Sequence, residues 1–222
     1  MKNTQAMSTF PGSPRLLRGG LVLLDPVAGL VLRIIALQYN PDTLTRSFQI
    51  KSASAETGDH TEALRLKGPP AETIKVEVEI DAADQLEIGD AKTVSAGLHP
   101  QIAAIETIVY PTSVHLQWLN ILAMAGSIEI APAQAPLSLF VFGPKRIVPV
   151  RITEISITEE AFDASLNPIR AKVSLGMRVL SVDDLGYDAK GGGLFMTYLQ
   201  AKELLARSNA GATFSKLGIN PI

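Results

Sequence analysis

The sequence predicts a mainly β protein with a helical insert, an α+β fold built as a barrel or sandwich with one extended hairpin. Residues 73–80 alternate strictly between apolar and polar side chains, as a half-buried strand does. Residues 99–126 change to helical spacing. Residues 169–182 alternate again, and at about 3.3 Å per residue they span about 45 Å, far more than a usual strand.

The N-terminal region predicts a flexible arm followed by a hairpin. Residues 1–19 are rich in Ser, Thr, Pro and Gly and show little apolar periodicity, which indicates the arm. Strands at 21–24 and 30–39 flank a Pro- and Gly-containing turn. The second strand is apolar on both faces except at Arg33 and Gln38, so we expect it to be covered on two sides, one of them by a neighbouring subunit.

A third strand at 44–50 and a polar surface loop at 53–70 come next. The strand at 73–80 then places Ile74, Val76, Val78 and Ile80 on one face, against Lys75, Glu77 and Glu79 on the other. This segment predicts an antiparallel strand with one buried face.

Two helices form the predicted insert. Pro100 suits a first helical position, and Tyr110-Pro111 ends that helix. The second helix runs from about 114 to 125, with Val114, Trp118 and Ile121 on one stripe. A large aromatic residue on such a stripe predicts a core anchor, so Trp118 is expected to be buried.

A second β block is predicted from strands at 137–142, 147–158 and 169–182, which we expect to form a second sheet. The last strand is apolar on one face and carries Arg170, Lys172 and Arg178 on the other. This basic face has two interpretations: a wall that faces a polar lumen or a partner, or the solvated side of a sheet.

The C-terminal region, 186–222, predicts a glycine-rich linker over Tyr187–Gly193, a helix, and a disordered tail after Arg207. The expected division is thus an arm at 1–19, a β domain at 20–185 with its helical insert at about 99–126, and this C-terminal region. No internal repeat is visible.

Composition narrows the function classes. The chain has 222 residues, a net charge of −2 and 19% charged residues, so no broad basic field indicates nucleic-acid binding. The longest apolar region, 21–37, is interrupted by Asp25, Pro26 and Arg33, so no direct membrane insertion is expected. The absence of cysteine excludes disulfides, thiol nucleophiles and Cys-based metal sites.

The search for chemistry predicts no catalytic, cofactor or metal site. His60, His99 and His115 have no metal-ligand spacing and are expected to be ordinary polar residues. Gly191-Gly192-Gly193 lacks a full phosphate-loop pattern. Glu159, Glu160 and Asp163 fall between two predicted strands, so a hairpin tip is favoured over paired catalytic carboxylates.

Several segments, in their order along the chain, carry a family resemblance that covers about residues 15–185. They read ALQYNP at 36–41, LKGPP at 66–70, LSLFVFGPKR at 137–146, and ISITEEAFD at 155–163 with LNPIRAKV at 166–173. These segments resemble the N-terminal domain of tube and baseplate proteins of contractile injection systems, the family that includes components of antifeeding-prophage-type particles. Some members carry a LysM module after this domain; since the sequence ends soon after Arg207, we expect neither that module nor a clamp role through it.

The resemblance implies a ring-forming, phage tail tube-like β fold in which six subunits stack between the spike hub and the inner tube. Expected partners are other copies of the chain, the spike hub protein, inner tube proteins, and baseplate and sheath components. Assembly is expected in the cytoplasm, into an injection particle that can be released. In this ring hypothesis the extended hairpin supplies intersubunit and stacking contacts, from Phe162, Asp163, Asn167, Pro168, Arg170, Lys172 and Arg178.

Two alternatives remain open at this point. One is a β-barrel binding module or small enzyme, with a pocket between the sheets and the helical insert. The other is an adaptor that carries cargo inside the particle.

Overall fold

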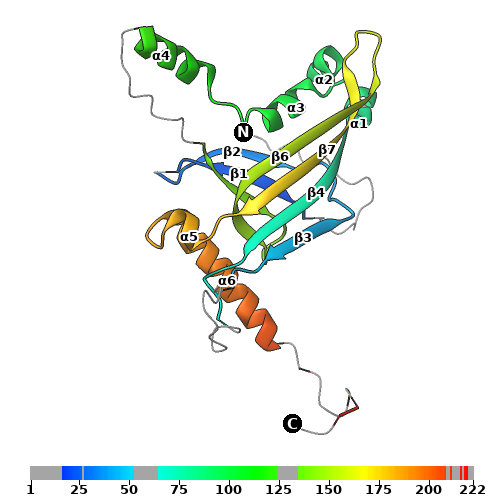
Figure 1. Ribbon diagram of the computed structural model, residues 1–222. Helices are drawn as coiled ribbons and strands as arrows, with labels where there is room; N and C mark the ends of the chain where they lie inside the picture. The colour runs from blue at the N-terminus through cyan, green and yellow to red at the C-terminus, as the bar shows by residue number, and fades with distance from the viewer. Residues whose placement is uncertain are drawn as a thin grey trace.

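The computed structural model describes residues 17–26, 28–52, 65–124, 135–208, 211, 216, 218 and 219. Most of the predicted arm, residues 53–64 of the predicted loop, and most of the predicted tail lie outside these residues. One sheet of seven strands organises the described chain, in the order β2-β1-β5-β6-β7-β4-β3 (Figure 1). All neighbouring strands are antiparallel. The strands are β1 Gly20–Leu24, β2 Val31–Ala36, β3 Leu44–Gln49, β4 Ala71–Asp81, β5 Leu137–Val141, β6 Ile147–Phe162 and β7 Pro168–Val179.

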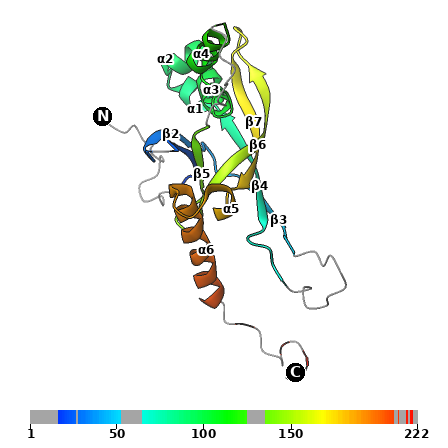
Figure 2. The same ribbon diagram turned by 60° about the vertical axis from the view of Figure 1, so that its left-hand side comes forward.

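The predicted α+β class is confirmed, but the prediction of a separate second sheet is wrong. Strand β6 joins the two blocks, because its residues 147–150 pair with β5 while most of its length pairs with β7. The sheet is strongly curled, so that β1 and β2 lie across from β4 and β3 (Figure 2). It does not close into a barrel, since β2 and β3 are its two ends and no ladder joins them in the described chain.

The core fills the inside of this curl. The largest fully buried side chains come from both halves of the sheet, among them Leu21 and Phe140 from one and Ile74, Leu175 and Met177 from the other. The predicted alternation of β4 is confirmed, because Ile74, Val76, Val78 and Ile80 are all buried. Burial of this one face fixes the register, since a slip of one residue would exchange the two faces.

Six helices accompany the sheet in the described residues: α1 Ala83–Glu87, α2 Ala91–Ala96, α3 His99–Glu106, α4 Ser113–Met124, α5 Val182–Leu185 and α6 Lys190–Ser208. The short helices α1 and α2 precede the segment in which helices were predicted. Helix α3 starts with Pro100 at its first turn and buries Ile102 and Ile105 against the core. None of these helices is long and apolar enough to cross a membrane.

Helix α4 forms where it was predicted, but the prediction that Trp118 is a core anchor is wrong. The helix buries none of its residues, and Trp118 is 57% exposed. Figure 1 shows α4 standing off from the sheet at the end of a connection from α3. The apolar stripe therefore marks a surface that stays exposed in the described part of the chain.

The C-terminal region also differs from its prediction. Helix α6 begins at Lys190, so the three glycines form its first turn and not a linker. A Cβ added to Gly191 would meet the side chain of Leu185, which shows that the glycines let α6 approach α5 closely. The strand predicted to reach residue 182 ends at Val179, because Ser181 and Asp184 form a capping box that starts α5.

Candidate assembly surfaces

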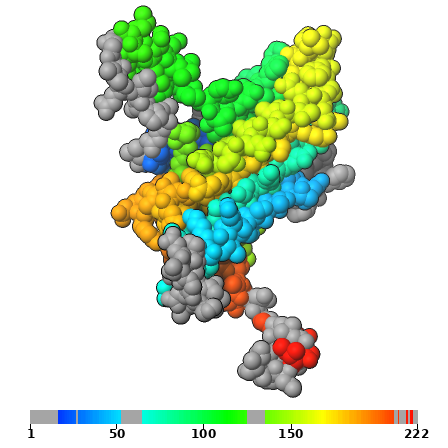
Figure 3. Space-filling view, viewed as in Figure 1, coloured from blue at the N-terminus to red at the C-terminus, as the bar shows by residue number. Residues whose placement is uncertain are grey.

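Strands β6, β7, β4 and β3 present a polar face on the side away from the core. Cross-strand partners share a face, so the registers identify its members. Short of the hairpin tip, where Phe162 pairs with Pro168, every position carries a polar or charged side chain except Ala71 and Gly176. Figure 3 shows this face as a row of adjacent strands with no helix across it. The face comprises Thr45, Ser47, Gln49, Ala71, Thr73, Lys75, Glu77, Glu79, Asp81, Arg151, Glu154, Ser156, Thr158, Glu160, Arg170, Lys172, Ser174, Gly176 and Arg178.

The predicted basic face of β7 is balanced by its neighbours. Arg170 pairs with Asp81 at 2.8 Å and with Glu79 at 3.3 Å. Lys172 pairs with Glu160 at 3.0 Å. The hydrogen bond and charge of Glu160 raise the pKa of Lys172. The polar face is therefore a mixed-charge surface on which β4 and β6 supply carboxylates to the cations of β7.

Arg178 lies at the other end of β7 and reaches a different element. Its guanidinium contacts the carboxylate of Asp184 in the α5 capping box at 2.6 Å. This contact ties the end of the polar face to the C-terminal helices.

A β-bulge at Thr153 keeps β6 amphipathic. The register to β7 shifts between Ile152 and Glu154, so that one residue has no partner of its own. Because of this extra residue, Ile152 and Ile155 both point to the core although they are three residues apart. Gly176 lies opposite the bulge, where an added Cβ would stand 3.1 Å from Cβ of Glu154.

The outer part of β6 has an open edge. Beyond residue 150, β6 pairs only with β7 in the described chain. The N–H of Ala82, just after β4, donates to the carbonyl of Ile169 in β7. Backbone groups of successive strand residues point to opposite sides, so odd-numbered residues of β7 form their backbone hydrogen bonds with β4 and even-numbered residues form theirs with β6. By the same alternation Ile155, Ile157 and Glu159 direct their N–H and C=O groups away from β7, to an edge that no described strand covers.

Strand β3 supplies a second open edge at the other side of the same four strands. In β4, Thr73 and Lys75 direct their N–H and C=O groups toward β3, where they face Ser47 and Thr45. The backbone groups of Thr45 and Ser47 are therefore used in hydrogen bonds to β4. Arg46 and Phe48 consequently direct their backbone groups outward. The strands β6, β7, β4 and β3 alternate in direction, so β6 and β3 run antiparallel to each other. If copies are related by rotation about an axis along the strands, β3 of one copy therefore meets β6 of the next as an antiparallel pair.

A buried ionic cluster holds β3 and α6 in place. The side chain of Glu72 is only 5% exposed and pairs with Arg46 and Lys202, each at 2.8 Å. Burial would raise the pKa of Glu72, but Lys202 and Arg46 outweigh it and hold that pKa below its usual value. Tyr198 of α6 donates to Glu72, and burial together with the Glu72 charge raises the pKa of Tyr198 to about 12.

The tip of the long hairpin contains four predicted contact residues. The carboxylate of Asp163 accepts from the N–H groups of Ser165 and Asn167 and from the amide of Asn167, which builds the turn. Phe162 is half-exposed beside it, whereas Pro168 is fully buried and its carbonyl accepts from Leu98.

The acidic residues predicted at the tip are placed differently. Glu159 and Glu160 lie within β6, because that strand runs on to Phe162, so the expectation that they form the turn is wrong. Ala161 and Leu166 have φ values of 51° and 64°, a conformation that non-glycine residues seldom adopt. Of the seven predicted contact residues, Arg170, Lys172 and Arg178 thus lie on the polar face, and Phe162, Asp163, Asn167 and Pro168 lie at the turn.

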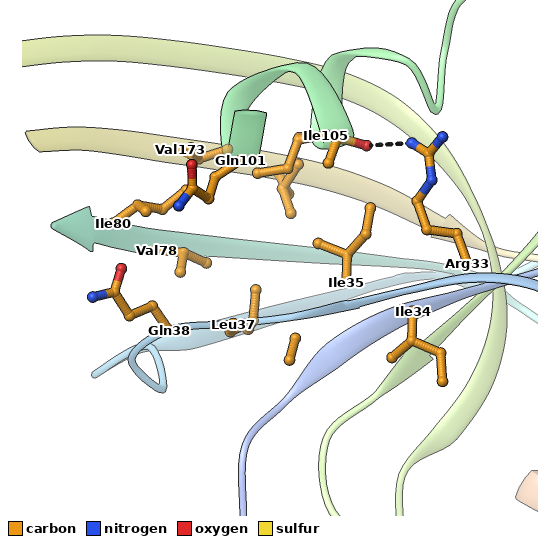
Figure 4. A pocket seen from close by; sticks show the side chains of 13 residues that line it. Arg33, Ile34, Ile35, Leu37, Gln38, Val78, Ile80, Gln101, Ile105 and Val173 are labelled. Atoms are coloured by element: carbon orange, nitrogen blue, oxygen red, sulfur yellow. Dashed lines mark hydrogen bonds between the residues drawn. The ribbon is translucent and has the colours of Figure 1, made fainter. Parts of the chain in front are cut away.

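An apolar cavity of about 340 Å³ lies between the two halves of the curl, under α3 (Figure 4). Figure 4 shows Ile35, Val78 and Ile105 around it, from β2, β4 and α3. Its charged lining residue is Arg33, whose guanidinium donates to the carbonyl of Ala104 and to the hydroxyl of Thr107. The prediction that β2 is covered on two sides is wrong for the described monomer, since Val31, Leu32 and Ile34 are 59%, 58% and 67% exposed. The sequence pattern also could not reveal this cavity, because α3 and β2 are distant in the chain.

No group of His, Asp or Glu side chains that could hold a metal occurs among the described residues. His99 and His115 lie at the start of α3 and in α4, and His60 lies outside the described chain.

Comparison with protein families and with curated proteins gives no match. Among solved structures, the chain is similar to one from the virion of a native gene transfer agent particle, with 12% identity and a TM-score of 0.28 over 72% of this chain and 90% of that one. It is also similar to one from the tail of an empty gene transfer agent particle with C6 symmetry, with 13% identity and a TM-score of 0.29 over the same shares. At these TM-scores the likeness assigns neither fold nor function to this chain.

Proposed function

We propose that this chain is a structural subunit of a phage-tail-like contractile injection system, which forms a ring at the baseplate-proximal end of the inner tube and joins the spike hub to the tube. The observation that carries the proposal is the pair of open antiparallel edges, β3 and outer β6, on one four-stranded segment with a polar outer face. An open edge carries unpaired N–H and C=O groups and is a template for another strand. Edge-to-edge pairing of identical copies satisfies both edges at once.

Ring closure explains why the face is polar and the edges are free. Identical rotations bring β3 of each copy beside the outer part of β6 of the next, so that neither of these two edges stays exposed in the ring. The mixed-charge face would line the lumen, where it stays in contact with water. Arg170, Lys172 and Arg178 are then lumen residues, each with a carboxylate partner in its own chain.

The hairpin tip is proposed as the stacking contact between this ring and the next layer. Phe162 is 51% exposed at the end of the longest strand. Asp163 and Asn167 hold the turn that presents it, and the buried Pro168 supports the turn from below. The six-fold copy number, the neighbouring hub, tube, baseplate and sheath proteins, and assembly in the cytoplasm come from the family resemblance of the sequence.

The test uses a proline at the open edge of β6. Glu159 is exposed and its N–H points to the open edge, so Glu159→Pro removes an edge donor without breaking the ladder to β7. We expect a folded monomer that no longer forms rings in light scattering and negative-stain electron microscopy. The matched control Glu159→Ala, which keeps the N–H, should form rings like the parent chain. Rings of normal yield from Glu159→Pro would contradict the proposal.

A second candidate function is the binding of a small apolar ligand, which the cavity under α3 favours. Its volume of about 340 Å³ lies at the lower end of the range for ligand pockets. A thermal-shift screen with alkyl and aryl ligands tests this function. Stabilisation of a chain that never self-associates would favour it over the ring.

A further inference from the structure

Helix α4 is uncharged and exposes a wide apolar stripe beside a narrow polar side of Ser113, Gln117 and Asn120. It contains no Asp, Glu, Lys or Arg. Val114, Trp118 and Ile121 form one stripe and are 72%, 57% and 56% exposed. The apolar stripe of a helix is normally packed against another element, and a helix of twelve residues is marginal in water without tertiary packing.

The area of this surface indicates a specific protein partner. The exposed apolar side chains of α4 present on the order of 600 Å², more than most monomers expose in one patch and close to one partner's share of a standard interface. A membrane surface is disfavoured as the partner, because helices that lie on membranes carry Lys and Arg on their polar face. The occupant must therefore offer an uncharged apolar site.

The chain itself contains such a site in the cavity under α3. Apart from Arg33, Gln38 and Gln101, all of its lining residues are apolar. Helix α4 cannot easily reach the cavity of its own copy, since Arg33 fixes the end of α3 at Ala104 and Thr107 and the connection to α4 starts there. Pro111 stiffens that connection, and Figure 1 shows α4 leading away from the sheet.

We propose that α4 docks on a second copy of this chain and inserts Trp118 into that copy's cavity beneath α3. The inference rests on the proposed ring, in which each copy has an identical neighbour, and it adds to the strand edges a second contact made by a helix. Large aromatic side chains that enter apolar pockets are typical anchors of interfaces. Helix α4 thereby ties adjacent subunits together independently of backbone pairing.

The single tryptophan of the chain reports directly on this contact. We expect the emission of Trp118 to shift to shorter wavelength as the protein concentration is raised and copies associate. In the Ala104→Phe variant the new side chain on α3 fills the cavity, so Trp118 cannot enter it. The emission of Trp118 should then stay at the wavelength of a water-exposed tryptophan at every concentration. The matched control Ala103→Phe lies next to it on the exposed side of α3 and should behave like the parent chain. Trp118→Ser should weaken association roughly ten- to thirty-fold.

Three results would overturn the inference. A shift that does not depend on concentration would place Trp118 in its own copy. A shift that persists in Ala104→Phe would place it outside the cavity. Rings in the electron microscope with Trp118 still in water would remove the helix contact and leave the ring function intact. Conversely, a concentration-dependent shift that Ala104→Phe abolishes supports the inference even where Glu159→Pro shows that the strand edges form no ring.

Discussion

The side-chain amide of Gln38 is bonded to the backbone of Asp81 in the manner of a paired strand residue. Its Nε2 donates to the Asp81 carbonyl at 2.6 Å, and its Oε1 accepts from the Asp81 N–H at 3.0 Å. This contact joins the chain just after β2 to the end of β4, although no ladder connects β2 and β3 in the described chain. A side chain thus holds the curled sheet together at one end of its open side.

Replacement of Gln38 by alanine should loosen the curl. Both backbone groups of Asp81 lose their partner at a partly buried position, which costs about 2 kcal/mol in the free energy of unfolding. Urea unfolding measures the loss. Gln38→Glu keeps the acceptor for the Asp81 N–H but sets a carboxylate oxygen against the Asp81 carbonyl, so it should be destabilised as well. Equal stability of all three proteins would refute the role of this amide.

Deletion of Thr153 should be tolerated, whereas deletion of Ser156 should abolish folding. Thr153 is the extra residue of the bulge, so its removal leaves Ile155 and Ile157 facing the core. Removal of Ser156 shifts one part of β6 by one residue, so that its apolar side chains turn to the polar face and its polar side chains turn to the core. Circular dichroism and thermal unfolding compare the two variants, and an unfolded Thr153 deletion would show that the bulge itself is required.

Aspartate substitutions at two adjacent positions of β7 should have opposite effects on folding, because the two side chains lie on opposite faces of the sheet. Val173 is 1% exposed, and Val173→Asp buries an unpaired charge, which should prevent folding. Ser174→Asp on the polar face should change stability by no more than about 0.5 kcal/mol. The soluble yield and the two-dimensional NMR spectrum distinguish these outcomes; a folded Val173→Asp variant would contradict the assignment of the faces.

Glu72 should make the free energy of unfolding depend on pH at acidic pH. Its pKa in the folded chain lies below the usual 4.5, so the folded state favours the charged carboxylate. The resulting stabilisation is complete above about pH 5.5 and is lost as the pH falls through 4.5 and then through the lowered pKa. Glu72→Gln should therefore cost about 3 kcal/mol at neutral pH and progressively less below about pH 4.5.

Glu77→Gln, on the exposed polar face of the same strand, is the control for this measurement. It should change the stability little at any pH. Denaturant midpoints for the three proteins from about pH 3 to about pH 8 provide the comparison, and a Glu72→Gln deficit that is constant across that range would contradict the linkage.

The sequence predicts most of the strands, because alternation reports directly on one-sided burial. The segments around Ile74 and Val173 fold as expected for this reason. Alternation cannot say which strands share a sheet, and so it missed that β6 bridges the two predicted blocks.

The helical stripe of Trp118 shows a second limit. Periodicity identifies an apolar surface but not what covers it, and no residue of α4 is buried in the described monomer. The open edges of β3 and β6 were likewise invisible, since backbone pairing across a sheet depends on long-range topology. The basic residues of β7 were identified, but the carboxylates that balance them come from β4, β6 and α5.

Disulfide trapping of β3 against β6 tests the ring most directly, because the chain has no cysteine of its own. Ser47 would be combined in turn with Glu154, Ser156 and Thr158, each pair replaced by cysteines. All lie on the polar face, at positions that would be non-hydrogen-bonded across the new edge, where Cα atoms stand about 4.5 Å apart. We predict that one of the three pairs gives a cross-linked ladder that ends in a closed ring, while each single cysteine variant forms no ladder. Failure of every pair to cross-link, or a dimer from Ser156→Cys alone, would contradict head-to-tail pairing of the two edges.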